Sequence, residues 1–388
     1  MILSLFILLP SFVHTFIGLS SMTYGFLLGI IFLIFYFIIL KRKKPILNQN
    51  KIIILSSICL ILFFNCLSVI MSNQSSKSSY LLIISCFYLI FIVLYSEDLL
   101  IKFINDFNRY GKKILFSVVI IVTLSFFFKK LNLGGNNSIF VYSEPSHLIL
   151  AILPLLIFVA LQSSTRSKLF LVLLMIAFLF MKKSFLALLA TAILCLFIKS
   201  YFFFLFSACT LSFLIFKYYS YFEYYFDRLT IFALTNNLSL LSFQDGYYRL
   251  FEVLSSKYCL GLGIGNLGYT QLDSSPYRKR INEIYEGNLN LYDGSIFSAK
   301  LITEFGFIGL ILLLIALLIL FNLFYLSSFK KLSRTLLFTF CIPFLFEAFI
   351  RGSSYFTFNI MLFLIISINY LSSKKALIKH SNALFFVK

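Results

Sequence analysis

Tryptophan is absent from this chain of 388 residues, and charged residues make up only 12% of it. Hydrophobic residues reach 61%, a share that a soluble domain carries only with very large exposed apolar patches. The scarcity of charge therefore excludes a soluble globular protein. Without tryptophan, tyrosine must form the aromatic belt at the membrane interface, and five tyrosines gather between 218 and 225.

The chain also lacks a recognisable cysteine pattern and has few acidic residues. Six of the seven cysteines lie inside apolar runs, and none follows the spacing of metal ligands, so neither a disulfide framework nor a zinc site is expected. The 14 acidic residues are outnumbered by 33 basic ones, which gives a net charge of +19. These basic residues form short clusters between apolar runs, where anionic lipid headgroups and membrane insertion explain them. Nucleic acid is excluded as a partner.

The apolar runs lack the alternation of a membrane-spanning strand, which excludes a β-barrel. Each run is about 15 to 22 residues long, enough for one helix to cross a bilayer. The first run is predicted to be a span and not a cleaved signal, because a basic leader and a small-residue cleavage site are missing. The sequence predicts an all-α, polytopic membrane protein with about twelve spans, at 2–19, 22–40, 52–72, 80–95, 114–128, 147–162, 169–181, 184–198, 202–216, 295–326, 336–350 and 358–372.

Basic clusters such as Lys41–Lys44, Lys330-Lys331 and Lys374-Lys375 fall on one side of this arrangement. The positive-inside rule makes that side cytoplasmic and places both termini there. Three parts follow: nine spans in 1–216, one large outer loop in 217–294, and three spans with a cytoplasmic tail in 295–388. The segment 97–113 is either an amphipathic helix on the cytoplasmic surface or a solvated connector.

Polar residues that could take part in catalysis or substrate binding gather on the predicted outer side. Glu144 and His147 flank the start of the span at 147–162, and Asp245 and Asp293 lie in the outer loop. Each is a candidate general base, and the sequence does not choose among them. Lys182 and Lys183 occupy a tight outer turn, where cations are disfavoured, so a role in binding diphosphate or lipid headgroups is predicted.

Arg249 precedes the run Gly261-Leu-Gly-Ile-Gly-Asn266 by twelve residues. Alternate glycines permit close backbone approach and present N–H groups, while arginine offers two parallel hydrogen bonds to a phosphate. The alternative is a turn with a nearby salt bridge from Arg249 to Asp245 or Glu252. The basic residues 278–280 follow Pro276 and are expected in a solvated turn.

The combined pattern resembles the O-antigen polymerase family of bacterial inner membranes, which is related to the O-antigen ligases. The resemblance covers about the C-terminal two thirds of the chain. Its pieces are Ser143-Glu-Pro-Ser146, Arg249 with the glycine run 261–266, Gly294-Ser295, the stretch from Lys300 through Glu304 and Gly306 to Gly309, and Arg351-Gly-Ser-Ser-Tyr355. Ligases carry a His–Asn pair where this chain has Ser295 and Ile296, which favours a polymerase.

The resemblance implies a GT-C-like, inverting, metal-independent glycosyltransferase without a cofactor. Such an enzyme joins undecaprenyl-diphosphate-linked oligosaccharide units on the periplasmic face, in lipopolysaccharide or other polysaccharide biosynthesis. Its partners are that lipid-linked substrate, membrane lipids and a polysaccharide chain-length regulator. In this family, periplasmic arginines bind the diphosphate. Together with the physical reading of the residues, this gives the candidate catalytic residues Arg249, Glu144, His147 and Asp293 and the candidate substrate-binding residues Lys182, Lys183, Arg351, Gly261, Gly263, Gly265, Asn266 and Tyr355. An O-antigen ligase and a lipid-linked oligosaccharide flippase remain alternatives.

Overall fold

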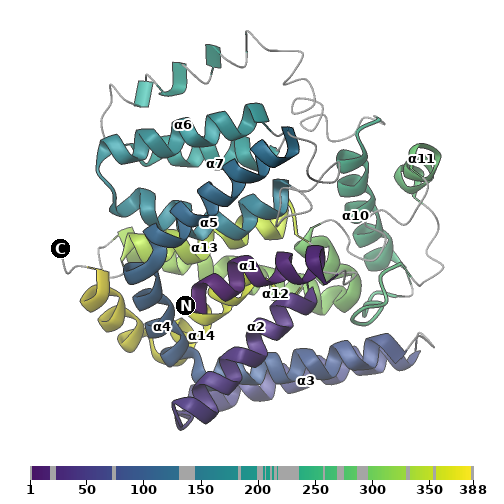
Figure 1. Ribbon diagram of the computed structural model, residues 1–388. Helices are drawn as coiled ribbons and strands as arrows, with labels where there is room; N and C mark the ends of the chain where they lie inside the picture. Colours follow the sequence, from purple (N-terminus) through teal and green to yellow (C-terminus); the bar gives the residue numbers. More distant parts are fainter. Residues whose placement is uncertain are drawn as a thin grey trace.

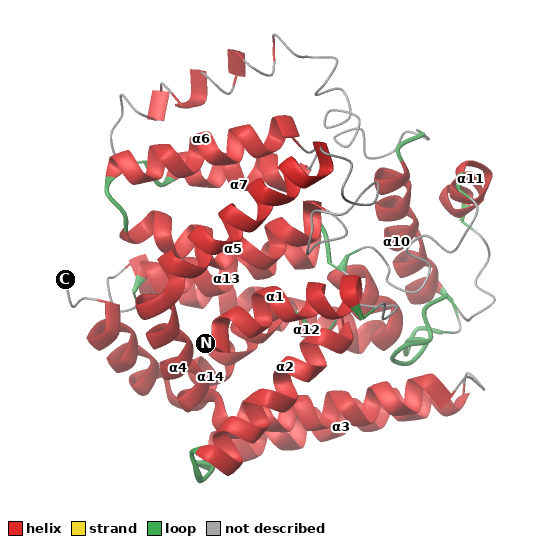
Figure 2. Ribbon diagram, viewed as in Figure 1, coloured by secondary structure: helices red, strands yellow, loops and turns green. Residues whose placement is uncertain are grey.

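A computed structural model of the chain describes residues 2–17, 23–71, 76–130, 145–181, 185–198, 236–256, 258–268, 275–285, 296–328, 333–352 and 355–385, with a few positions between 204 and 216. Within these ranges the chain forms 13 helical elements. In Figure 2 the described residues are coloured as helices or as short loops. The predicted all-helical class is confirmed for this part of the chain.

The helices occur along the chain in the following order. They are α1 (Ile2–Phe16), α2 (Thr23–Phe35) with the π-helical turn η1 (Tyr36–Leu40), α3 (Gln49–Met71), α4 (Ser76–Lys130), α5 (Pro145–Gln162), α6 (Thr165–Met181), α7 (Phe185–Leu196), α10 (Leu238–Ser255), α11 (Pro276–Ile284), α12 (Phe297–Ser328), α13 (Arg334–Phe349) and α14 (Phe358–Phe385). Of the helices named here, α4 is the longest with 55 residues and α11 the shortest α-helix with nine.

Among the described residues, four segments are long and apolar enough to cross a bilayer. They are Thr23–Leu40, Gln49–Ile70, Tyr80–Thr123 and Phe297–Ser328. Shorter apolar helices cover Ile2–His14, Ser146–Gln162, Leu186–Leu196 and Phe358–Lys374. By their length and composition, these helices indicate an integral membrane protein.

Helix α4 corrects one sequence prediction. The spans expected at 80–95 and 114–128 belong to a single continuous helix, and the segment between them is helical and packs one face against the protein. Its apolar residues Leu99, Leu100 and Phe103 are completely buried against the rest of the protein. Three of its charged residues form ion pairs: Asp98 with Lys43 at 2.8 Å, and Lys102 with Asp106 at 3.0 Å. Asp106, which is 2% exposed, is therefore buried with a partner. An amphipathic pattern is the same for a membrane surface and for a protein core.

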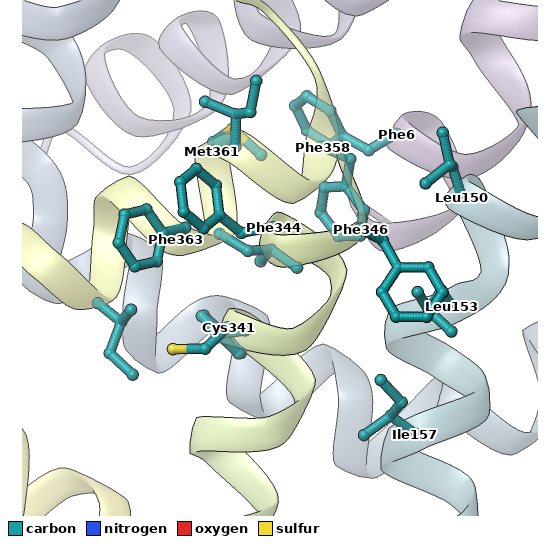
Figure 3. Packing of buried hydrophobic residues seen from close by; sticks show 14 of the residues in the cluster. Phe6, Leu150, Leu153, Ile157, Cys341, Phe344, Phe346, Phe358, Met361 and Phe363 are labelled. Carbon is teal, nitrogen blue, oxygen red and sulfur yellow. The ribbon is translucent and has the colours of Figure 1, made fainter. Parts of the chain in front are cut away.

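The hydrophobic core lies where α1, α4, α5, α13 and α14 meet (Figures 1 and 3). Figure 3 shows Phe344 of α13 facing Phe363 of α14, with their ring centroids 3.9 Å apart. On the other side of α14, Phe6 of α1 stacks on Phe358 at 5.6 Å. These stacked rings bury large apolar areas and hold the C-terminal helices against the first helix.

Helix α3 connects two chemically different ends of the molecule. At one end, called the basic end, the side-chain amide of Asn50 donates to the Ser372 carbonyl at 3.2 Å, which brings Lys41–Lys44 and Lys374 to the same side. At the other end, called the loop end, the hydroxyl of Ser68 donates to the Leu260 carbonyl at 3.2 Å. At 1.5 Å per residue, these two contacts are separated by about 27 Å along the helix axis.

Helices α10 and α11 lie at one side of the molecule in Figure 1, and α10 packs against α12. Asn237 caps α10 by accepting hydrogen bonds from the N–H groups of Ser239 and Leu240. Ser275 caps α11 in the same way, and Pro276 occupies its first turn. The predicted outer loop therefore contains two capped helices.

Candidate functional site

The candidate site is organised around a break in α12. Gly306 has φ 59° and ψ −137°, which separates the first turns of α12, from Phe297 to Phe305, from the long apolar remainder. Only glycine adopts such angles without steric strain. A break of this kind releases backbone groups from the helical hydrogen-bond pattern, and they require other partners.

Those partners come from the glycine loop, residues 258–268. The N–H of Leu262 donates to the Thr303 carbonyl at 3.1 Å, and the N–H of Gly263 donates to the Glu304 carbonyl at 2.9 Å. In return, the N–H of Phe307 donates to the Cys259 carbonyl at 2.9 Å. The glycine loop and the α12 break thus supply each other's backbone hydrogen-bond partners.

Close approach of two backbones explains the glycines on both sides of this junction. Gly261 has φ +95°, and a Cβ atom at this position would collide with the Glu304 carbonyl and the Gly306 amide. A Cβ atom on Gly306 would collide with the Cys259 carbonyl. The prediction of close backbone approach is confirmed, with α12 as the neighbour.

Asn65 of α3 joins the glycine loop to the α12 break. Its Nδ2 donates to the Glu304 carbonyl at 3.0 Å, and its Oδ1 accepts from the Ile264 N–H at 2.9 Å. The side chain is 2% exposed, so both bonds are shielded from water. Sequence analysis missed Asn65, although a lone amide inside an apolar run is itself a signal, because polar groups in a membrane span need partners.

Glu304 also connects the break to the segment before α14. The Tyr355 hydroxyl donates to the Glu304 carboxylate at 2.7 Å, and Glu304 is completely buried. The ammonium of Lys300 lies 5.5 Å from the centroid of the Tyr355 ring, close enough for a cation–π interaction. The rings of Phe297 and Phe305 pack edge-on against Tyr355 at 5.7 and 6.1 Å. The arrangement places a carboxylate, a phenol and a cation together at the loop end.

A second polar cluster joins α10 to α11. Asp245 accepts hydrogen bonds from Nε and Nη2 of Arg278, at 3.1 and 2.5 Å, and from the hydroxyl of Ser275. Arg249, one turn after Asp245 on α10, also contacts this carboxylate, with Nε at 3.3 Å. Burial lowers the pKa of Arg249 from its ordinary value, and the nearby Asp245 opposes that shift. Arginine stays charged in this setting, so the cluster is a buried ion network.

Arg278 is the second correction. It was expected in a solvated turn, but it is 5% exposed and makes a two-point bond to Asp245. The reason is the Ser275 cap, which starts α11 and turns Arg278 toward α10. Its neighbour Arg280 agrees better with the expectation, because its exposed side chain pairs with Glu283 at 2.6 Å.

The structure brings together only part of the predicted site set. The glycine run 261–266 and Tyr355 meet through Glu304, and Arg351 lies half-buried just before Tyr355. His147 is half-buried in the first turn of α5. The predicted residues Glu144, Lys182, Lys183 and Asp293 lie outside the described part of the chain.

The glycine amides have partners inside the protein. The N–H groups of Gly261 and Gly263 donate to the carbonyls of Tyr258 and Glu304. A phosphate near the loop would therefore have to be bound by other donors than these two. That Gly261, Gly263, Gly265 and Asn266 contact substrate stays a prediction.

Within the described ranges, no three His, Cys, Asp or Glu side chains form a set of metal ligands. Comparison of the chain with protein-family models, curated proteins and solved structures found no match.

Proposed function

We propose that the protein is a multi-pass membrane glycosyltransferase of the O-antigen polymerase kind. It transfers a growing glycan from undecaprenyl diphosphate to an incoming lipid-linked repeat unit, on the periplasmic face of a bacterial inner membrane. The reaction inverts the transferred sugar and requires no metal or cofactor. The membrane arrangement that belongs to this proposal has twelve spans and both termini in the cytoplasm.

One observation carries the proposal: the distant segments on which the resemblance rests meet at one place. The run 261–266 bonds to the α12 break within the stretch 300–309, and Tyr355 from the last segment bonds to Glu304 of that stretch. Residues 261 and 355 are far apart in sequence, so apolar composition alone does not bring them together. Such convergence is what a shared substrate site requires.

The two ends of α3 support the proposed topology. The lysines of the 41–44 cluster gather at the basic end, and the glycine loop, the α12 break and Tyr355 gather at the loop end. The positive-inside rule assigns the basic end to the cytoplasm. The candidate site then faces the periplasm, where lipid-linked repeat units are joined.

The chemistry needs cations for the leaving diphosphate and a base for the acceptor hydroxyl. Arg249, Arg351, Lys182 and Lys183 are the proposed cations. Among the four candidate bases, Asp245 is the weakest choice, because both its carboxylate oxygens already accept hydrogen bonds or ion pairs from Ser275, Arg278 and Arg249. Glu144, His147 and Asp293 remain.

A deletion strain tests the proposal directly through the length of its surface glycan on a gel. Loss of a polymerase leaves a single repeat unit on the lipid core. Loss of all repeat units indicates a ligase instead. Repeat units that accumulate on undecaprenyl diphosphate at the cytoplasmic face indicate a flippase, and unchanged polymer removes all three functions.

A further inference from the structure

Glu347 is a buried carboxylate that lies near the candidate site but outside the proposed catalytic and binding sets. It belongs to the last turn of α13 and is 2% exposed. Within the described ranges, no lysine or arginine forms an ion pair with it. A buried carboxylate without a cation costs stability that an apolar side chain would not, so its presence calls for a specific role.

The N-terminus of α14 compensates for the charge of Glu347. The side chains of Thr357, just before α14, and Asn359, in its first turn, both donate hydrogen bonds to the carboxylate. Thr357 also caps this helix, because its hydroxyl accepts a hydrogen bond from the Ile360 N–H at 3.3 Å. Helix N-termini attract negative charge through their free N–H groups and the helix dipole. The carboxylate therefore ties the end of α13 to the start of α14.

The described residues 350–352 and 355–357, called the α13–α14 connection, contact Glu347 at both ends. At the start, the Arg351 N–H donates to the Phe346 carbonyl at 3.0 Å, which closes the end of α13. Gly352 then lies against Glu347, since a Cβ atom on Gly352 would come within 2.8 Å of Glu347 Cγ and still closer to its carbonyl oxygen. At the other end, the connection reaches the carboxylate through the cap of α14.

The α13–α14 connection carries two residues of the predicted binding set, Arg351 and Tyr355. The Tyr355 hydroxyl donates to the buried Glu304 at 2.7 Å and so reaches the α12 break. Tyr355 and its neighbour Phe356 also line a cavity of about 580 Å³ between α3, α4, α12, α13 and α14. A shift of the connection would therefore move a phenol that contacts both the break and the cavity.

Apolar contacts hold the same connection less strictly. The Phe356 ring packs edge-on against Tyr88 of α4 at 5.3 Å, and the Phe297 ring packs against Tyr355 at 5.7 Å. Ring contacts of this kind tolerate small displacements, since their preferred centroid distances cover about 4.5–7 Å. Hydrogen-bond lengths vary over only about half an ångström. The hydrogen bonds to Glu347 therefore restrict the position of the connection more tightly than the rings do.

We propose that Glu347 is a positioning residue of the candidate site. It holds the α13–α14 connection through Thr357 and Asn359, and thereby fixes where Arg351 and Tyr355 stand relative to the α12 break. Glu347 is enclosed and acts through these residues without contacting substrate. Its effect on glycan transfer rests on the proposed function, because a misplaced cation or phenol slows a reaction that depends on the geometry of its site.

Hydrogen–deuterium exchange of the purified full chain tests how firmly the connection is held. Glu347→Leu removes the acceptor and should raise exchange in peptides covering residues 350–357 about tenfold, equivalent to about 1.4 kcal/mol. Glu347→Gln keeps an acceptor oxygen and should stay close to the unmodified protein.

Thr339→Val is the matched control for Glu347→Leu. Thr339 is also buried on α13, about two turns earlier, and its hydroxyl has no hydrogen-bond partner among the described residues, so exchange should not change. If Glu347→Leu does not accumulate, Thr357→Val removes the bond from the donor side and should raise exchange similarly. Thr357→Ser keeps the hydroxyl and should not.

Glycan length in the deletion strain, complemented with each variant at matched protein levels, tests the effect on the reaction. Glu347→Leu should leave mostly single repeat units, and Glu347→Gln should restore long polymer. This rescue separates positioning from a general loss of folded protein. Equal exchange in Glu347→Leu and the unmodified protein would overturn the inference, as would glycan from Glu347→Gln as short as that from Glu347→Leu, or an equal defect in Thr339→Val.

Two further results separate the inference from the proposed function. Faster exchange in Glu347→Leu, together with unchanged polymer in the deletion strain itself, refutes the proposed function and leaves Glu347 as the residue that holds the connection. Loss of polymer in the deletion strain, together with normal glycan from Glu347→Leu, refutes only the inference.

Discussion

Asn65→Leu tests whether one buried amide holds the glycine loop against the α12 break. The substitution keeps the approximate volume of the side chain but removes both hydrogen bonds. The Ile264 N–H, now 2.9 Å from Asn65 Oδ1, loses its acceptor, and the Glu304 carbonyl keeps its bond from Gly263. The first loss is the larger, because it leaves a buried donor without an acceptor.

The expected cost follows from these two losses. An unsatisfied buried donor costs about 1–3 kcal/mol, and one lost hydrogen bond to a carbonyl that keeps another costs about 1 kcal/mol. The sum is about 2–4 kcal/mol of local stability. If the glycine loop opens as a unit, the smaller figure already increases amide exchange in residues 258–268 about thirtyfold.

Hydrogen–deuterium exchange on the purified protein measures this opening. Asn322→Leu is the control, since the exposed Asn322 amide donates only to the Leu318 carbonyl of its own helix at 2.9 Å. It should leave exchange in the glycine loop unchanged. Equal protection of residues 258–268 in Asn65→Leu and the unmodified protein would refute the argument that Asn65 holds the junction together.

Three other predictions concern the outer loop and the topology. Arg278→Gln should detach α11 from α10 and lower stability by about 3–5 kcal/mol, because it breaks a buried ion pair, while the control Lys279→Gln should have no effect. Limited proteolysis between α10 and α12 should cleave the Arg278 variant faster, and equal cleavage of both variants contradicts the buried role of Arg278. If both guanidinium hydrogen bonds of Arg249 hold the diphosphate, Arg249→Lys should shorten the glycan at matched protein levels and an unchanged thermal midpoint. Glycan of normal length would show that Arg249 does not bind the diphosphate. In a cysteine-free background, a membrane-impermeant reagent added from the periplasm should label a cysteine at Ser274 and not one at the exposed Ser328; the opposite pattern reverses the topology.

Composition was enough to predict the class of protein. Long apolar stretches that lack charge must avoid water, and a helix is the simplest way for one segment to satisfy its own backbone in lipid. The stretches predicted at 22–40, 52–72 and 295–326 accordingly correspond to α2 with η1, α3 and α12. The points at which one helix ends and the next begins were less predictable. The helix α4 continues through residues 97–113, where no proline interrupts it and the buried Asp106 is paired with Lys102.

In the candidate site, too, the sequence predicted local features but not the partners of each segment. Alternate glycines predicted a close backbone approach, since only glycine leaves room for it. The sequence did not say that the approaching backbone is the α12 break. It also ranked Arg249 above Arg278, whereas the structure shows that both arginines share the carboxylate of Asp245.

The sequence by itself determined the helical membrane class, the apolar segments and the long polar interval, because these depend on local composition and on one helix at a time. Tertiary structure alone decided that Asn65 meets Ile264 and Glu304, 199 and 239 residues further along the chain. Helical periodicity indicates which face of a segment is apolar but not which segment covers it. The pairing of distant polar groups therefore follows from how the helices pack, and that packing created both the α12 junction and the cavity beside it.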